Sequence, residues 1–223
     1  MAITAETKDC TALSDSELSE MADTCADGPS KYEAGLLSKQ AEEWVLVTLV
    51  REGRSLKGFS FCTLERIGGT PCIIMGCGSF KRTARRDAYL RAALSDQFRR
   101  AVLAFPDEDV LVAARVAQPG AYEAFRTLHD VVPRPGHTPT GEERAWGRRL
   151  AKRYGIDPKR FDDRRSLVKG DGTFPLVLDH ETTRPERLPE GIDELFSDVD
   201  PQRGDSLIVF GWVMAEELAK IET

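Results

Sequence analysis

The chain has 223 residues, of which 41% are hydrophobic and 30% are charged. This length supports one well-packed core, so we expect a single domain over residues 1–223. The formal net charge of −6 argues against a general nucleic-acid-binding surface. The longest apolar run, 45–50, falls far below the roughly 20 residues of a membrane span, and residues 1–9 lack a secretory signal pattern. We therefore expect a soluble cytoplasmic protein with no nucleic-acid or membrane partner.

The cysteines and histidines give no pattern of a metal site. The five cysteines are odd in number and lack the C-x-x-C spacing of zinc ligands, so buried free thiols are expected at Cys10, Cys25, Cys62, Cys72 and Cys77. None of the three histidines forms a helical pair with a carboxylate between, and no metal is predicted; they are His129, His137 and His180. A catalytic cysteine–histidine pair stays open as an alternative, because such residues meet in space rather than in sequence.

The N-terminal segment predicts a strand and two helices. The strand lies near Ile3, and a capping box of Ser14 and Glu17 begins the first helix. A second box, Ser30 with Glu33, is expected to begin the next helix.

A β-meander is expected next. Three β-rich runs at 44–50, 56–64 and 72–77 are separated by Gly-containing turns, which is typical of antiparallel strands. An amphipathic helix at 83–105 and a short apolar strand at 110–117 follow. A strand, a helix and a strand in this order imply a parallel crossover, so we expect 72–77 and 110–117 to be neighbouring strands.

The last third of the chain reads as an insertion or extension at 129–205 within the same domain. A third capping box, Thr140 with Glu143, begins a helix that places Trp146 and Leu150 four residues apart on one apolar face. We expect this face to pack on the domain. A short helix at 120–128 precedes the insertion, and late strands are predicted at 174–178 and 207–212.

The order of strand, two helices, three-strand meander, helix, strand and helix over 3–128 resembles the GNAT superfamily of N-acyltransferases, as a divergent member. The resemblance implies an α/β (α+β) fold with a mixed central sheet flanked by helices. It also implies that the 72–77 and 110–117 strands diverge and that the pantetheine arm of an acyl donor lies in the gap. An unrelated α+β fold with a similar element order is the alternative.

The resemblance places the donor's phosphates at the start of the 83–105 helix, where free backbone N–H groups and the helix dipole favour an anion. Between residues 81 and 100 stand seven basic residues against two acidic ones, within an acidic protein. The donor-binding residues implied are Met75, Cys77 and Gly78 on the strand, and Lys81, Arg82, Arg85 and Arg86 at the phosphates.

The phosphate segment departs from the family pattern of Arg or Gln, two residues, Gly, one residue, and Gly or Ala. Arg82 matches the first position, but Arg85 and Asp87 stand at the glycine positions, so the backbone approaches a pyrophosphate less closely. The arginines would suit a single phosphate or an acidic acyl carrier protein, or would form a solvated helix face. The predicted co-substrate is acyl-CoA or acyl-phosphopantetheine, with no tightly bound cofactor.

The resemblance also implies an acid and a base. Phe125 stands where the family often carries a tyrosine that protonates the leaving thiolate, so Tyr122 is predicted in that role and Tyr89 is a substitute. Glu65 is the predicted base for the amine, since its strand approaches the expected gap. The function this implies is acyl transfer to a small-molecule or protein amine. The alternative is a non-catalytic interaction protein on the same scaffold with a degenerate donor site.

Overall fold

The computed structural model describes residues 1–221. The N-terminal half contains, in chain order, β1 (Ile3–Asp9), α1 (Asp15–Cys25), α2 (Ala34–Glu43), β2 (Leu46–Glu52), β3 (Ser55–Ile67) and β4 (Thr70–Phe80). Then follow α3 (Arg86–Ala104), β5 (Val110–Val116), β6 (His129–Val132), α4 (Gly141–Arg153), β7 (Phe161–Asp162), β8 (Leu167–Val168), β9 (Leu178–Asp179), α5 (Ile192–Leu195), β10 (Ser206–Val213) and α6 (Ala215–Leu218).

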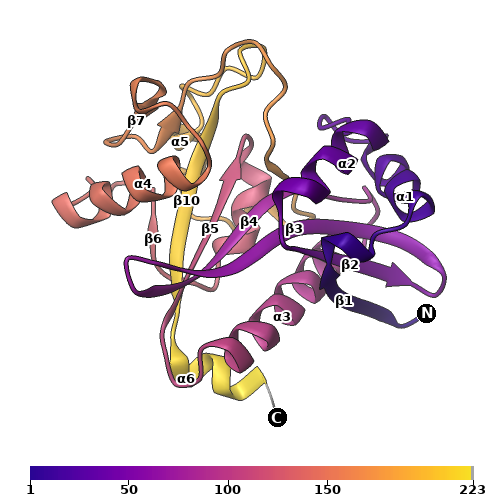
Figure 1. The fold of residues 1–223 in the computed structure, drawn as a ribbon. Coiled ribbons are helices and arrows are strands. Elements are labelled where there is room, and N and C mark those ends of the chain that lie inside the picture. The colour runs from indigo at the N-terminus through magenta and orange to yellow at the C-terminus, as the bar shows by residue number, and fades with distance from the viewer. Residues whose placement is uncertain (222–223) are drawn as a thin grey trace.

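The described strands join in one mixed sheet of order β1-β2-β3-β4-β5-β10-β8-β7, with β6 added to β10 and β9 to β4. Helix α3 lies on one face of this sheet, and α1 and α2 lie on the other (Figure 1). The predicted α/β fold with a mixed central sheet and flanking helices is therefore confirmed. None of the described helices is long and apolar enough to cross a membrane.

Each face of the sheet buries its own apolar cluster. On one face, Tyr89 and Leu90 of α3 pack with Val112 of β5. On the other, Met21 of α1 and Leu37 of α2 pack with strand side chains. The five cysteines are free and buried, as expected.

Two of the three predicted capping boxes mark the start of a helix. Both capping-box bonds form at Ser14 and at Thr140, which begin α1 and α4. The second predicted box is wrong, because α2 begins at Ala34 without a side-chain cap. The backbone N–H of Ser30 donates instead to Asp179, far along the chain. The helix predicted at 120–128 is a 3-10 helix over Pro119–Phe125.

Helix α4 packs on the domain through the predicted apolar face. Trp146 and Leu150 are buried in a cluster with Ile208 and Phe210 of β10, and the Trp146 ring meets Trp212 edge-on at 6.1 Å. The strand predicted at 207–212 is confirmed within β10. The strand predicted at 174–178 is shorter and later than expected, since only Leu178–Asp179 pair as β9.

Strands β4 and β5 are parallel neighbours that separate, as predicted. They pair only from Cys72 with Leu111 to Ile74 with Ala113. Farther along, β4 pairs with β9, where Gly78 meets Leu178. The described part of the chain thus has no strand pairing on this edge of β4 between these two contacts, and β9 fills the far end of the gap.

Candidate functional site

A pocket of about 240 Å³, here called the wedge pocket, opens where β4 loses β5 as its partner. Gly76 of β4 and Arg115 of β5 lie two residues beyond the last pair of the ladder, and both line it. The remaining lining residues come from α2 and its end, the end of α4, and the chain before β9: Gln40, Glu43, Trp44, Cys77, Arg153, Tyr154, Gly155 and Leu176.

A β-bulge forms the β4 wall of this pocket. Ser60 pairs with Gly78 while Cys62 pairs with Met75, so β4 has one residue more than β3 over this stretch. A bulge interrupts the ladder and turns the local backbone. The bulged residues Gly76 and Cys77 therefore present backbone to the pocket.

The end of α4 brings a phenol to the same wall. Gly155 adopts a left-handed conformation that ends the helix, as the sequence indicates. Tyr154 there donates its hydroxyl to the Met75 carbonyl at 3.0 Å. Burial holds the pKa of Tyr154 far above its usual value, although Arg115 and Arg153 act in the opposite direction. The phenol is therefore protonated at neutral pH.

The end of α2 supplies a carboxylate. Glu43 is exposed and accepts a hydrogen bond from the Gln40 side-chain amide at 3.0 Å. The carbonyl of the same Gln40 side chain accepts from the Trp44 indole N–H at 3.1 Å. Gln40 is buried, so it holds both neighbours in position.

Residues 175–183, here called the plug segment, run along β4 beyond the wedge pocket. In Figure 1 the orange chain that contains them descends between α2 and strands β4 and β5. The Gly78 N–H donates to the Val177 carbonyl at 3.2 Å. The Tyr32 hydroxyl donates to that same carbonyl at 2.9 Å and accepts from the Val177 N–H at 3.0 Å. The plug segment therefore uses the free edge of β4.

Asp179 anchors the centre of the plug segment. It is buried and accepts from Arg82 at 2.8 Å and from the Gln118 amide at 2.7 Å. Burial raises the pKa of this carboxyl, while Arg82 opposes the shift. Arg82 also pairs with Glu181 at 2.5 Å.

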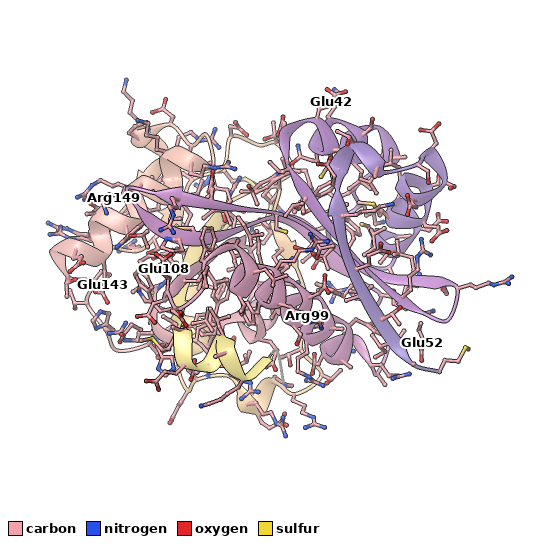
Figure 2. All side chains as sticks on the ribbon, turned by 60° about the horizontal axis from the view of Figure 1, so that its bottom comes forward. Glu42, Glu52, Arg99, Glu108, Glu143 and Arg149 are labelled. Carbon is pink, nitrogen blue, oxygen red and sulfur yellow. The ribbon has the colours of Figure 1, made fainter. Side chains whose placement is uncertain are left out.

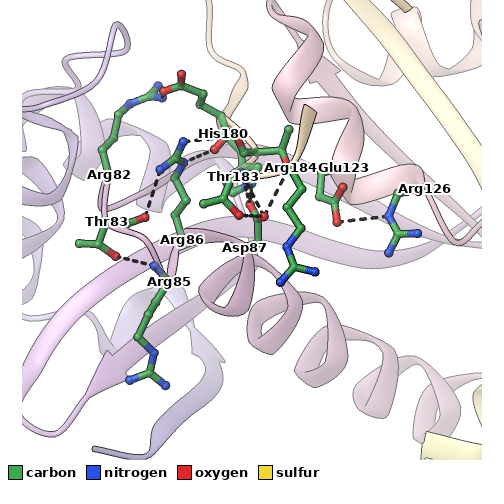
Figure 3. A network of polar contacts seen from close by, with 12 residues as sticks. Arg82, Thr83, Arg85, Arg86, Asp87, Glu123, Arg126, His180, Thr183 and Arg184 are labelled. Carbon is green, nitrogen blue, oxygen red and sulfur yellow. Dashed lines mark hydrogen bonds and ion pairs between the residues drawn. The ribbon is translucent and has the colours of Figure 1, made fainter. Parts of the chain in front are cut away.

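The end of the plug segment covers the start of α3 (Figure 3). His180 lies 2.9 Å from the Asp87 carboxylate, and the Thr183 N–H donates to the same group at 3.1 Å. Burial lowers the pKa of His180 to about 4 despite Asp87, so the ring is neutral and its Nε2 donates. Burial also opposes the ionisation of Asp87, but the bonds from Thr183 and His180 outweigh it and lower that pKa.

The predicted phosphate-binding residues meet the chain's own acceptors. Arg86 donates to the carbonyls of Glu181 and Thr182. Arg85 pairs with Glu52, and Lys81 with Asp27. Arg99 projects from the exposed side of α3 (Figure 2), and Arg91 and Arg100 are exposed too.

The two residues predicted for proton transfer do not line the wedge pocket. Glu65 pairs with Arg153, which does line it, so Glu65 stands behind the wall. Tyr122 is buried and donates to the Pro133 carbonyl at 3.0 Å, and burial raises its pKa to about 12. Tyr89 donates to Glu52 at 2.8 Å. Their catalytic roles stay predictions.

Sequence reasoning missed three residues that the pocket brings together: Glu43, Arg115 and Tyr154. Arg115 offered a signal, since it is the single charge in an otherwise apolar strand. Tyr154 and Glu43 offered none, because their place depends on how α4 and α2 pack over β4.

No family model matches the chain, and no curated protein matches it. Several solved structures do match it. The Escherichia coli ribosomal-protein-S18-alanine N-acetyltransferase is 9% identical, with 95% of each chain covered and a TM-score of 0.44. A GNAT-family acetyltransferase from Bacillus cereus is 13% identical, covering 60% of this chain and 90% of that one, with a TM-score of 0.38. A Bacillus subtilis acetyltransferase in complex with CoA is 12% identical, covering 96% and 100%, with a TM-score of 0.39.

The chain has a GNAT-like fold. Its element order and the separation of β4 from β5 are the features that it shares with that fold. The gap between β4 and β5 that the resemblance implies is present, and a pocket and a chain segment share it. The wedge pocket lies at its start and the plug segment fills the rest.

Proposed function

We propose that the protein is an N-acyltransferase that moves an acyl group from a phosphopantetheine thioester to an amine in the wedge pocket. One observation carries the proposal: the pocket opens where, within the described residues, β4 has lost β5 and has no strand partner on that edge. A carboxylate, a protonated phenol and bulged backbone converge there, and acyl transfer from a thioester requires groups of these kinds.

Each group has a step in the proposed reaction. The backbone N–H of Cys77 in the bulge stabilises the oxyanion that forms on the thioester carbonyl. The Glu43 carboxylate takes the proton that the attacking ammonium loses. As the carbon–sulfur bond breaks, the Tyr154 hydroxyl donates its proton to the leaving thiolate, and the second proton that the nitrogen must lose to become an amide returns to the Tyr154 oxygen. Glu65 acts through Arg153 in this scheme and not as the base.

The donor's arm would follow the free edge of β4, which the plug segment now uses. Acyl-CoA or an acylated carrier protein therefore binds after the plug segment leaves. Its departure would free Arg82 and Arg86 for the donor's phosphates, because both now bind the plug segment. The proposed co-substrate is acyl-CoA, and a carrier protein is an arm of the test.

A second candidate is a non-catalytic interaction protein, and a specific observation favours it. The plug segment is held by buried polar contacts of Asp179 and His180, which a mobile lid would lack. On this view the donor path is closed permanently, and the GNAT-like scaffold presents its surface to partners.

One variant distinguishes the two candidates. Asp179→Ala removes the anchor that holds Arg82, Gln118 and the Ser30 backbone, so it should loosen the plug segment. We expect calorimetry to find tighter binding of acetyl-CoA, long-chain acyl-CoA or acylated carrier protein to this variant than to the wild type. Thiol release in the presence of amines should rise with it.

The matched control is Asp198→Ala, which removes an exposed carboxylate paired with Arg165 and should change neither readout. If the Asp179→Ala protein folds but binds no donor and releases no thiol, the acyltransferase proposal is contradicted and the interaction-protein candidate is supported.

A further inference from the structure

Arg115 is a charged side chain inside the sheet that has no carboxylate partner among the described residues. It is the single charged side chain of β5, and its strand neighbours Ala114 and Val116 are buried. Its Nε and Nη2 both donate to the Ser206 hydroxyl, at 3.2 and 3.0 Å. Within residues 1–221 no carboxylate lies within ion-pair distance of it, and its Nη1 has no hydrogen-bond partner.

Among the described residues, several part-buried arginines have carboxylate partners, as Arg82 has Asp179, Arg153 has Glu65 and Arg134 has Glu143. Arg86 and Arg144 lack a carboxylate partner as Arg115 does, but neither of them lines the wedge pocket. Withdrawing a charge from water without a partner is unfavourable. A part-buried guanidinium that lines a pocket and keeps donors free therefore fits a bound anion, and its planar fork matches a carboxylate.

The pocket also carries an unmatched charge of the opposite sign. Glu43 accepts only the neutral amide of Gln40, and no described cation pairs with it. The remaining cation in the lining, Arg153, is already paired with Glu65 and stacks over the Trp44 ring at 5.3 Å. The wedge pocket thus offers one free cation and one free carboxylate within the described residues.

The size of the pocket limits its ligand. At about 240 Å³ it lies below the range of roughly 300–1,000 Å³ typical of pockets for drug-sized ligands. A small molecule with a carboxylate for Arg115 and an ammonium for Glu43 matches both the volume and the charges. A free amino acid has this chemistry.

We propose that the wedge pocket binds amino acids, with Arg115 holding the carboxylate and Glu43 facing the amino group. Amino-acid binding is inferred from the pocket alone, whereas the role of the amino acid as acyl acceptor rests on the proposed function. Binding in this orientation brings the amine to Glu43, the proposed base, on the pocket that the Gly76–Cys77 backbone lines.

The test is calorimetric titration of the whole protein, without an acyl donor, using the common amino acids and their amides. Each amide keeps the side chain and the ammonium and loses only the carboxylate. We expect at least one amino acid to bind at least tenfold more tightly than its amide. Arg115→Gln should abolish this preference and Arg115→Lys should retain part of it. The control Arg66→Gln, which removes an exposed arginine paired with Glu108, should leave it intact.

Equal affinity for acids and amides in the wild type would overturn the proposal, as would the failure of every amino acid to bind. The wild-type comparison needs no variant, so it decides even if Arg115→Gln does not fold. Amino acids that bind but are never acylated would overturn the proposed function alone. Acylation of amines and amides in preference to amino acids would overturn this inference alone.

Discussion

The wedge pocket and the plug segment occupy the same gap between β4 and β5, one behind the other, yet their charges are arranged in opposite ways. In the pocket Arg115 and Glu43 lack ion partners among the described residues. Along the plug segment, Arg82 and Asp87 each meet complementary groups. Buried charges with partners hold a structure in place. The part-buried Arg115 and the exposed Glu43 instead keep hydrogen-bonding capacity that a ligand can use.

The comparison assigns different roles to the two ends of the gap. The plug segment behaves as part of the fold, because its contacts join residues far apart in the chain, such as Asp87 and His180, which are 93 positions apart. The proposals make the pocket the binding site. Variants in the plug segment should therefore mainly lower the free energy of unfolding, and variants in the pocket should mainly change ligand binding.

The largest stability effect is expected for Asp87→Ala. The change leaves the buried His180 Nε2–H and the Thr183 N–H without an acceptor, and each unsatisfied donor costs about 1–3 kcal/mol. We expect urea unfolding to report a loss of about 3 kcal/mol or more. Asp198→Ala, at an exposed ion pair, should cost under about 0.5 kcal/mol. Similar values for the two variants would contradict a structural role for the plug segment.

The next largest effect is a loss of stability on acidification, which we expect from the protonation of His180. Burial lowers its folded pKa to about 4, so the unfolded chain binds this proton below about pH 6.5 and the folded chain does not. Stability should therefore fall as the pH drops from about 6.5 to 4, by about 3 kcal/mol at most. His180→Gln keeps a donor for Asp87 and does not titrate, so its stability should fall less over this window.

The difference between the wild type and His180→Gln is the quantity to measure, by urea unfolding at several pH values. Asp179 has a raised pKa, which acts in the opposite direction on acidification, and the subtraction removes its contribution. Parallel pH profiles for the two proteins would show that His180 is not held neutral by burial.

The sequence predicts well those features that depend on neighbouring residues. The capping boxes at Ser14 and Thr140 and the amphipathic face of α4 need only local spacing. The separation of β4 from β5 follows from element order and the family resemblance. The plug segment could not be predicted, since nothing near Val177 indicates that it pairs with Gly78 of a distant strand.

The same limit applies to polar groups whose partners lie far along the chain. The sequence predicts that the arginines at the start of α3 bind a donor's phosphates, and in the structure Arg82 pairs with Asp179 and Glu181 of the same chain. Ser30 resembles a helix cap in sequence, yet its backbone N–H is used by Asp179. Arg115 is different, because the sequence itself marks it: a single charge in an otherwise apolar strand indicates a special role.

The smallest effects come from a matched pair of tyrosines, one at each end of the gap. The Tyr32 hydroxyl makes two bonds to the Val177 backbone in the plug segment, while the Tyr154 hydroxyl makes one, to Met75 at the pocket. With a net value of about 1 kcal/mol per hydrogen bond, Tyr32→Phe should cost about 2 kcal/mol and Tyr154→Phe about 1 kcal/mol. Urea unfolding of both variants measures these values.

The two variants should also differ in function, and here Tyr154→Phe should have the larger effect. Tyr32→Phe loosens the plug segment and should raise acyl-CoA binding, measured by calorimetry, without altering the pocket. Tyr154→Phe removes the proposed proton donor to the thiolate and should slow acyl transfer by about 10²-fold or more, in line with general acid catalysis, while amino-acid affinity is unchanged. A Tyr154→Phe protein that transfers acyl groups at the wild-type rate would remove this phenol from the mechanism. Equal effects of the two variants on every readout would show that the two ends of the gap are one structural unit and not a fold element beside a binding site.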